Sequence, residues 1–178
     1  MRFYDLIFQT TGIDFYSMET LAEARSTAQQ RLGFSVQQTV SSIGAFALQV
    51  AQALVFPALA QPTFVVDFPP EAQPFARRNG DRRTVSYFEL FIHGARVAAG
   101  NDEINDPRQL EESFGEQHVK AAHRSPEQIE SISHALTCGQ PPSASLKISI
   151  EQLVTLLCRV DDVRKIVFFP IQEMRGNP

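Results

Sequence analysis

The chain has 178 residues, of which 43% are hydrophobic and 14 are Phe, so it can bury a substantial core. A chain of this length is expected to fold as one domain, covering residues 1–178. Its net charge of −4 and its pI near 5.6 argue against a nucleic-acid partner. Its longest apolar runs are shorter than the roughly 18 residues of a membrane span, so no membrane association is expected.

Metal-binding patterns are not evident. Cys138 and Cys158 lack the spacing of metal ligands, and the same holds for His118, His123 and His134. The first residues contain Asp5 within their apolar run and do not resemble a signal peptide, so a cytoplasmic location is expected. We therefore predict neither a metal nor a cofactor.

The first third of the sequence predicts helices. We expect them at 3–11, ended by Gly12; at 17–32, capped by Ser17; and at 43–55, capped by Ser41 or Ser42 and ended by Pro57. A strand at 64–68 follows and is closed by Pro69. The loop at 71–86 carries four arginines, which are either a solvated connection or a docking patch for an anionic partner.

The central stretch from Tyr87 to Pro107 predicts a β-hairpin followed by a helix. Phe88, Leu90 and Ile92 alternate with other residues at the period of a strand, and His93-Gly94 suits a turn with positive φ. A second strand is expected at 95–99. Further elements are helices at 107–122 and 125–136, a strand at 146–150, a helix burying Leu153, Val154, Leu156 and Leu157, and a last strand at 165–169.

The predicted fold class is therefore α+β, an antiparallel sheet of four to five strands with helices packed on one side. Two stretches resemble the class II lysyl-tRNA synthetase family. The residues FELFI, Gly94, Glu103 and Asn105-Asp106-Pro107 stand in register with that family's F-E-L-F-I-x-G-x-E-I-x-N-x-x-S-E-L-N-D-P pattern. Residues 138–160 resemble the third class II signature motif.

This resemblance implies a degenerate, truncated paralogue, equivalent to the C-terminal half of the catalytic domain. The first two class II motifs and the anticodon-binding domain are expected to be missing. By resemblance, Glu89, Arg96 and Gln152 occupy the former ATP and magnesium positions, and Ala99, Asn101 and Glu103 occupy the former lysine site. Arg96 reverses the charge of a carboxylate in the family, and Gln152 replaces an arginine.

These substitutions predict that the chain is not an enzyme and has no catalytic residue. We expect a structural or regulatory subunit that binds another protein or a second copy of itself. The expected surface is the old active-site face with the adjoining sheet edge. Two alternatives stay open: a sensor of lysine or a lysine-like molecule, and a fragment of a lysine–tRNA ligase completed by another chain.

Overall fold

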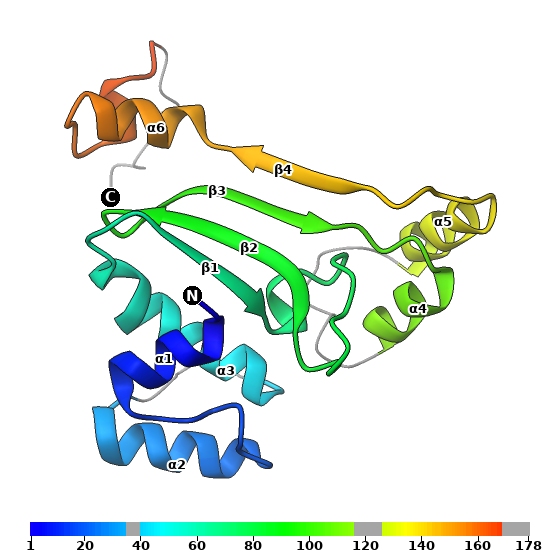
Figure 1. Cartoon of the computed structure of the whole chain (residues 1–178), viewed down its shortest axis with the longest axis horizontal. Helices are drawn as coiled ribbons and strands as arrows, with labels where there is room; N and C mark the ends of the chain where they lie inside the picture. Colours follow the sequence, from blue (N-terminus) through cyan, green and yellow to red (C-terminus); the bar gives the residue numbers. More distant parts are fainter. Residues whose placement is uncertain (35–39, 116–125, 169–178) are drawn as a thin grey trace, which may run out of the picture.

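The computed structural model describes residues 1–34, 40–115 and 126–168, which form a four-stranded antiparallel sheet flanked by helices (Figure 1). The sheet has the order β1-β2-β3-β4, and its strands are β1 Thr63–Phe68, β2 Val85–Ile92, β3 Ala95–Asp102 and β4 Ala144–Ile148. The helices are α1 Phe3–Thr11, α2 Leu21–Leu32, α3 Ile43–Val50, α4 Pro107–Gly115, α5 Pro126–Thr137 and α6 Ile150–Leu157. The predicted α+β class is confirmed.

The N-terminal helices follow the sequence signals closely. Gly12 ends α1 in a left-handed conformation, as expected of a C-terminal glycine. The predicted cap Ser17 is wrong: α2 begins later, and the Thr20 side chain accepts the Glu23 amide. Ser42 caps α3 by accepting the Ala45 amide, and the helix continues as a π turn at Ala51–Val55.

The C-terminal prediction was wrong. A strand was expected at 165–169, but Val163–Lys165 forms a 3-10 turn and Ile166 lies in a turn. Phe169 lies outside the described residues, as do Ser125 and the predicted continuation of α4 beyond Gly115. The expected buried side of α6 is also wrong, because α6 has no buried residue and Leu157 is 75% exposed.

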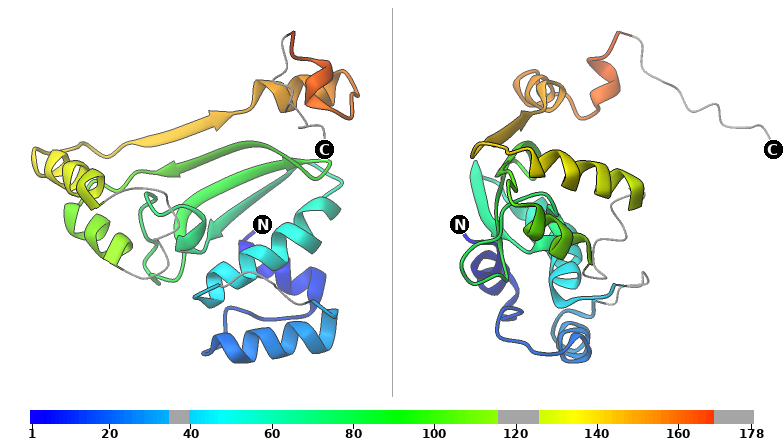
Figure 2. Two further views of the ribbon diagram at one scale, coloured as in Figure 1. Left: turned by 180° about the vertical axis from the view of Figure 1, so that it is seen from behind. Right: turned by 90° about the vertical axis from the view of Figure 1, so that its right-hand side faces the viewer.

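The main core lies between the N-terminal helices and one half of the sheet. Phe3, Phe46 and Val50 are fully or almost fully buried there, and Phe56 stacks on Phe91 of β2 with ring centroids 4.4 Å apart. A second, smaller core joins α4 and α5 and contains Ile104, Leu110 and Leu136. In two views, α1 to α3 lie near β1 and β4 forms the opposite edge (Figures 1 and 2).

Cross-strand pairing divides the sheet into two faces. Val65 pairs with Glu89, Glu89 with Ala99, and Ala99 with Lys147, so these side chains share one face, here called the helix face. The alternate residues form the open face: Phe64, Val66, Phe88, Leu90, Leu146 and Ile148. On the open face Phe64, Leu146 and Ile148 are each more than half exposed.

This arrangement corrects one expectation. From the sequence, the N-terminal helices were expected on one face of the sheet and the old active site on the other face. The register instead puts the N-terminal helices over β1 and β2 and the predicted site residues over β3 and β4 of the same helix face. The uncovered apolar residues therefore lie on the opposite side of the sheet from that site.

Candidate functional site

A pocket of about 550 Å³ opens on the helix face over β3, β4 and the first turn of α6. Its size lies within the usual range of small-molecule sites. It is lined by Gln73, Tyr87, Ala95, Arg96, Val97, Ala98, Ala99, Gly100, Asn101, Ser145, Lys147, Ser149 and Gln152. We call it the β3–β4 pocket.

A β-bulge brings Arg96 into this pocket. Leu90 pairs with Ala98, but the next residue of β2, Phe91, pairs with Arg96, so β3 contains one extra residue at this point. The extra residue reverses the alternation of side chains beyond it. Arg96 therefore shares the helix face with Ala99, although an unbroken strand would place these two side chains on opposite faces.

Arg96 is held by a buried carboxylate. Its Nη1 donates to Oε1 of Glu89 at 2.6 Å, and the Tyr87 hydroxyl donates to the same oxygen at 2.7 Å. The Glu89 side chain is only 9% exposed, whereas that of Arg96 is 60% exposed. The hydrogen bond to Glu89 raises the pKa of Arg96 above its usual value, while burial and the same carboxylate raise the pKa of Tyr87.

The floor of the pocket is polar and organised around Asn101. The Oδ1 atom of Asn101 accepts from Nε2 of Gln73 and from Oγ of Ser145, each at 3.2 Å. Its own Nδ2 donates to the Asp102 carbonyl at 3.2 Å. Because Asn101 is only 6% exposed, these three hydrogen bonds satisfy an amide that would otherwise be costly to bury.

The start of α6 forms the far wall. Ser149 donates its amide to the Val97 carbonyl at 2.8 Å, which joins the end of β4 to β3. Its side chain then caps α6 by accepting the Gln152 amide at 3.2 Å. This local turn is what carries Gln152 to the pocket.

The structure thus unites part of the predicted site. Arg96, Ala99, Asn101 and Gln152 line the pocket, and Glu89 lies under Arg96. Glu103 is not part of the lining; it is half-buried, and its amide donates to Ser143. The roles of these six residues stay predictions.

Tyr87 and Gln73 also line the pocket, and neither was expected there from the sequence. Tyr87 could have been found, because it lies two positions from Glu89 on a strand and must share its face. Gln73 could not have been found from the sequence, because it belongs to a loop whose course depends on tertiary contacts.

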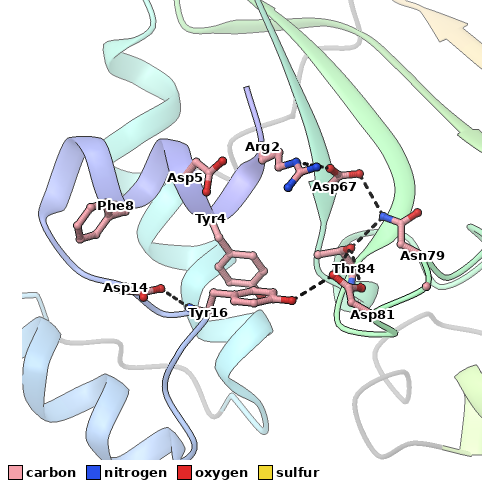
Figure 3. A pocket seen from close by; sticks show the side chains of 11 residues that line it. Arg2, Tyr4, Asp5, Phe8, Asp14, Tyr16, Asp67, Asn79, Asp81 and Thr84 are labelled. Atoms are coloured by element: carbon pink, nitrogen blue, oxygen red, sulfur yellow. Dashed lines mark hydrogen bonds and ion pairs between the residues drawn. The ribbon is translucent and has the colours of Figure 1, made fainter.

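A second pocket, of about 520 Å³, lies between α1 and the loop after β1 (Figure 3). Its polar side chains bond one another: Arg2 pairs with Asp67, Asp67 accepts from Asn79, and the Tyr16 hydroxyl donates to Asp81. These contacts attach the N-terminal segment to the loop. We therefore assign them a structural role.

The arginine-rich loop is also explained by internal contacts. Arg77 pairs with Asp102, Arg82 with Glu112, and Arg83 donates to the Tyr16 carbonyl. The solvated connection is favoured over an anionic docking patch. Within the described ranges, no group of three His, Cys, Asp or Glu side chains could hold a metal. No helix in this part of the chain is long and apolar enough to cross a membrane.

Comparison with known proteins identifies the class. The sequence profile of class II tRNA synthetases (D, K and N) matches residues 14–173, so the chain belongs to this family. Its relatives include the lysine–tRNA ligase of Prochlorococcus marinus, 33% identical over 94% of this chain and 34% of the relative. The lysine–tRNA ligase of Pelotomaculum thermopropionicum is 34% identical over 92% of this chain and 33% of the relative.

The chain is thus a lysyl-tRNA synthetase-like domain that spans about a third of the length of these curated relatives. The prediction that it is not an enzyme is wrong in the light of these comparisons. The relatives are named as ligases, and the chain belongs to their family. Arg96 and Gln152 are differences within an enzyme family and do not establish that activity has been lost.

Proposed function

We propose that the chain is part of a lysine–tRNA ligase catalytic domain and supplies the wall of the site that faces lysine and nucleotide. One observation carries this proposal. Four of the positions that the resemblance assigns to ATP and lysine line the β3–β4 pocket. They are Arg96, Ala99 and Asn101 on β3 and Gln152 on α6. A shared pocket is what a site for two substrates requires.

The rest of the catalytic site then comes from further protein, in the same polypeptide or in a second one. Two features support this part of the proposal. Among the described strands, β4 has a neighbour on one side only. Leu146 and Ile148 of β4 are 60% and 52% exposed, which suits a surface that another segment covers. The free thiols of Cys138 and Cys158 are compatible with the cytoplasm expected from the sequence.

A complementation assay tests the ligase proposal. The chain is mixed with the segment that precedes the matched region in the Pelotomaculum ligase, and lysine-dependent exchange of pyrophosphate into ATP is measured. We expect exchange above that of either part alone. The rate should be about 10³-fold or more below that of the intact relative, because Gln152 cannot supply the charge of an arginine at a reacting phosphate.

A matched pair of variants controls this assay. Ala99→Leu narrows the β3–β4 pocket and should abolish the exchange, whereas Ala135→Leu, at an exposed position of α5, should leave it unchanged. The absence of lysine-dependent exchange from every mixture, despite formation of the complex, would contradict the proposal.

A further inference from the structure

The resemblance implies magnesium beside Glu89, and the residues present do not fit that ion. Magnesium takes oxygen ligands in a strict octahedron, usually including one or two carboxylates. Here the Oε1 atom of Glu89 already accepts from Arg96 at 2.6 Å and from Tyr87 at 2.7 Å. A divalent cation bound to this carboxylate would also lie close to the positive guanidinium and be repelled by it.

Arg96 itself has the properties of a bound cation. A guanidinium carries five N–H donors in a fixed plane, and Glu89 uses one of them in the structure. The side chain is 60% exposed and lines the pocket, so its other donors are accessible to a ligand. The bulge and Glu89 together fix its position, which lowers the entropy lost when a ligand binds.

The remaining charge of the pocket has the same sign. Lys147 is the other charged residue in the lining, and its side chain is exposed on the helix face. The other polar residues are neutral: Gln73, Tyr87, Asn101, Ser145, Ser149 and Gln152. A lining with two cations and several amide and hydroxyl groups is complementary to an anion with many acceptor oxygens, such as a chain of phosphates.

We infer that the β3–β4 pocket binds the phosphates of a nucleoside triphosphate directly through Arg96 and Lys147, without a divalent cation. The nucleoside part of this assignment rests on the proposed ligase function. The phosphate part rests on the charges and donors of the pocket. Arg96 thus takes the place of the metal as the positive group nearest to Glu89.

Calorimetric titration of the chain with ATP tests the inference, in EDTA and again with excess Mg²⁺. We expect binding in EDTA and weaker binding with Mg²⁺, because the metal neutralises the phosphates that the two side chains recognise. Pyrophosphate should displace ATP. A requirement for Mg²⁺, or displacement by adenosine but not by pyrophosphate, would overturn the inference.

Variants identify the two contacts. Lys147→Gln should weaken ATP binding about tenfold, the usual effect of losing a charge-assisted hydrogen bond. Lys165→Gln removes an exposed lysine outside the pocket and should have no effect. Arg96→Gln alone leaves Glu89 buried without its cation, so the double variant Glu89→Gln/Arg96→Gln is used, with its fold checked by circular dichroism.

The double variant should also lose about tenfold in affinity. Unchanged affinity in both Lys147→Gln and the double variant would refute the assignment of the contacts. This titration uses the chain alone, whereas the exchange assay uses the completed ligase. A failure of phosphate binding is therefore distinguishable from a failure of the ligase proposal.

Discussion

At the scale of single residues, the arrangement around Glu89 stands out because a carboxylate is buried with two donors on one of its oxygens. Tyr87 and Arg96 hold it from two sides, at 2.7 and 2.6 Å. Burying a charged group is tolerated only when it is paired and hydrogen-bonded. The three side chains should therefore act as a unit in stability measurements.

We predict that Tyr87→Phe lowers the free energy of unfolding at pH 7 by about 1.5–3 kcal/mol, because it removes a hydrogen bond to a buried charge. The substitution should also change how the free energy of unfolding depends on pH in alkaline solution. Burial and Glu89 raise the pKa of Tyr87 above its ordinary 10.0, so the folded protein retains a proton that the unfolded chain releases. This stabilisation is complete below pH 10.0 and is lost as the pH rises further.

Urea denaturation between pH 8 and 12 provides the measurement. The variant should lose less stability over this range than the wild type does. Some alkaline loss should persist, since burial also raises the pKa of Tyr4. Parallel pH curves for the two proteins would contradict the assignment.

At the scale of elements, the hairpin was the most predictable part of the chain. Alternation of apolar residues predicted the first strand, the His93-Gly94 pair predicted the turn, and the small residues up to Ala99 predicted the second strand. Both turn residues have positive φ. The bulge was not predictable, because Arg96-Val97-Ala98 contains no local signal for an extra residue. The final strand was predicted from resemblance to the family's closing sequence pattern, which cannot show whether a neighbouring strand is there to pair with it.

The turn allows a direct test. Gly94 has a φ of +75°, and an added Cβ would lie 2.8 Å from the Pro57 carbonyl oxygen. Gly94→Ala should therefore cost about 1–3 kcal/mol, the range of a strained backbone position. Gly80→Ala is the control, because a Cβ there meets nothing within 4 Å. Equal urea midpoints for the two variants would contradict this account of the turn.

At the scale of the whole molecule, the open face and the β4 edge are continuous. From the sequence, a partner surface was expected on the pocket side, whereas the exposed apolar residues of β4 lie on the other face of the sheet. The reason is that successive side chains of β4 point to opposite faces of the sheet. Ser145 and Lys147 face the pocket, while Leu146 and Ile148 face away from it. A shift of one residue reverses such an assignment.

We expect the chain to self-associate when no complementary segment is present. An interface of standard size would bury about 800 Å² on each side. Ile148→Glu, on the open face, should shift the chain towards a monomer in size exclusion with light scattering, whereas Ser145→Arg, in the pocket, should not. A wild type that runs only as a 19.9 kDa monomer at all concentrations would contradict this expectation.

The two edges of the sheet differ in one further respect. At the β1 edge, the Met1 ammonium donates to the Phe64 carbonyl and the Val66 amide donates to the Met1 carbonyl, so the start of the chain occupies the groups that another strand would need. Only β4 is left to accept a strand among the described elements. If two copies pair through β4, each uses its one available edge. The assembly then closes as a two-fold dimer and cannot extend into a filament.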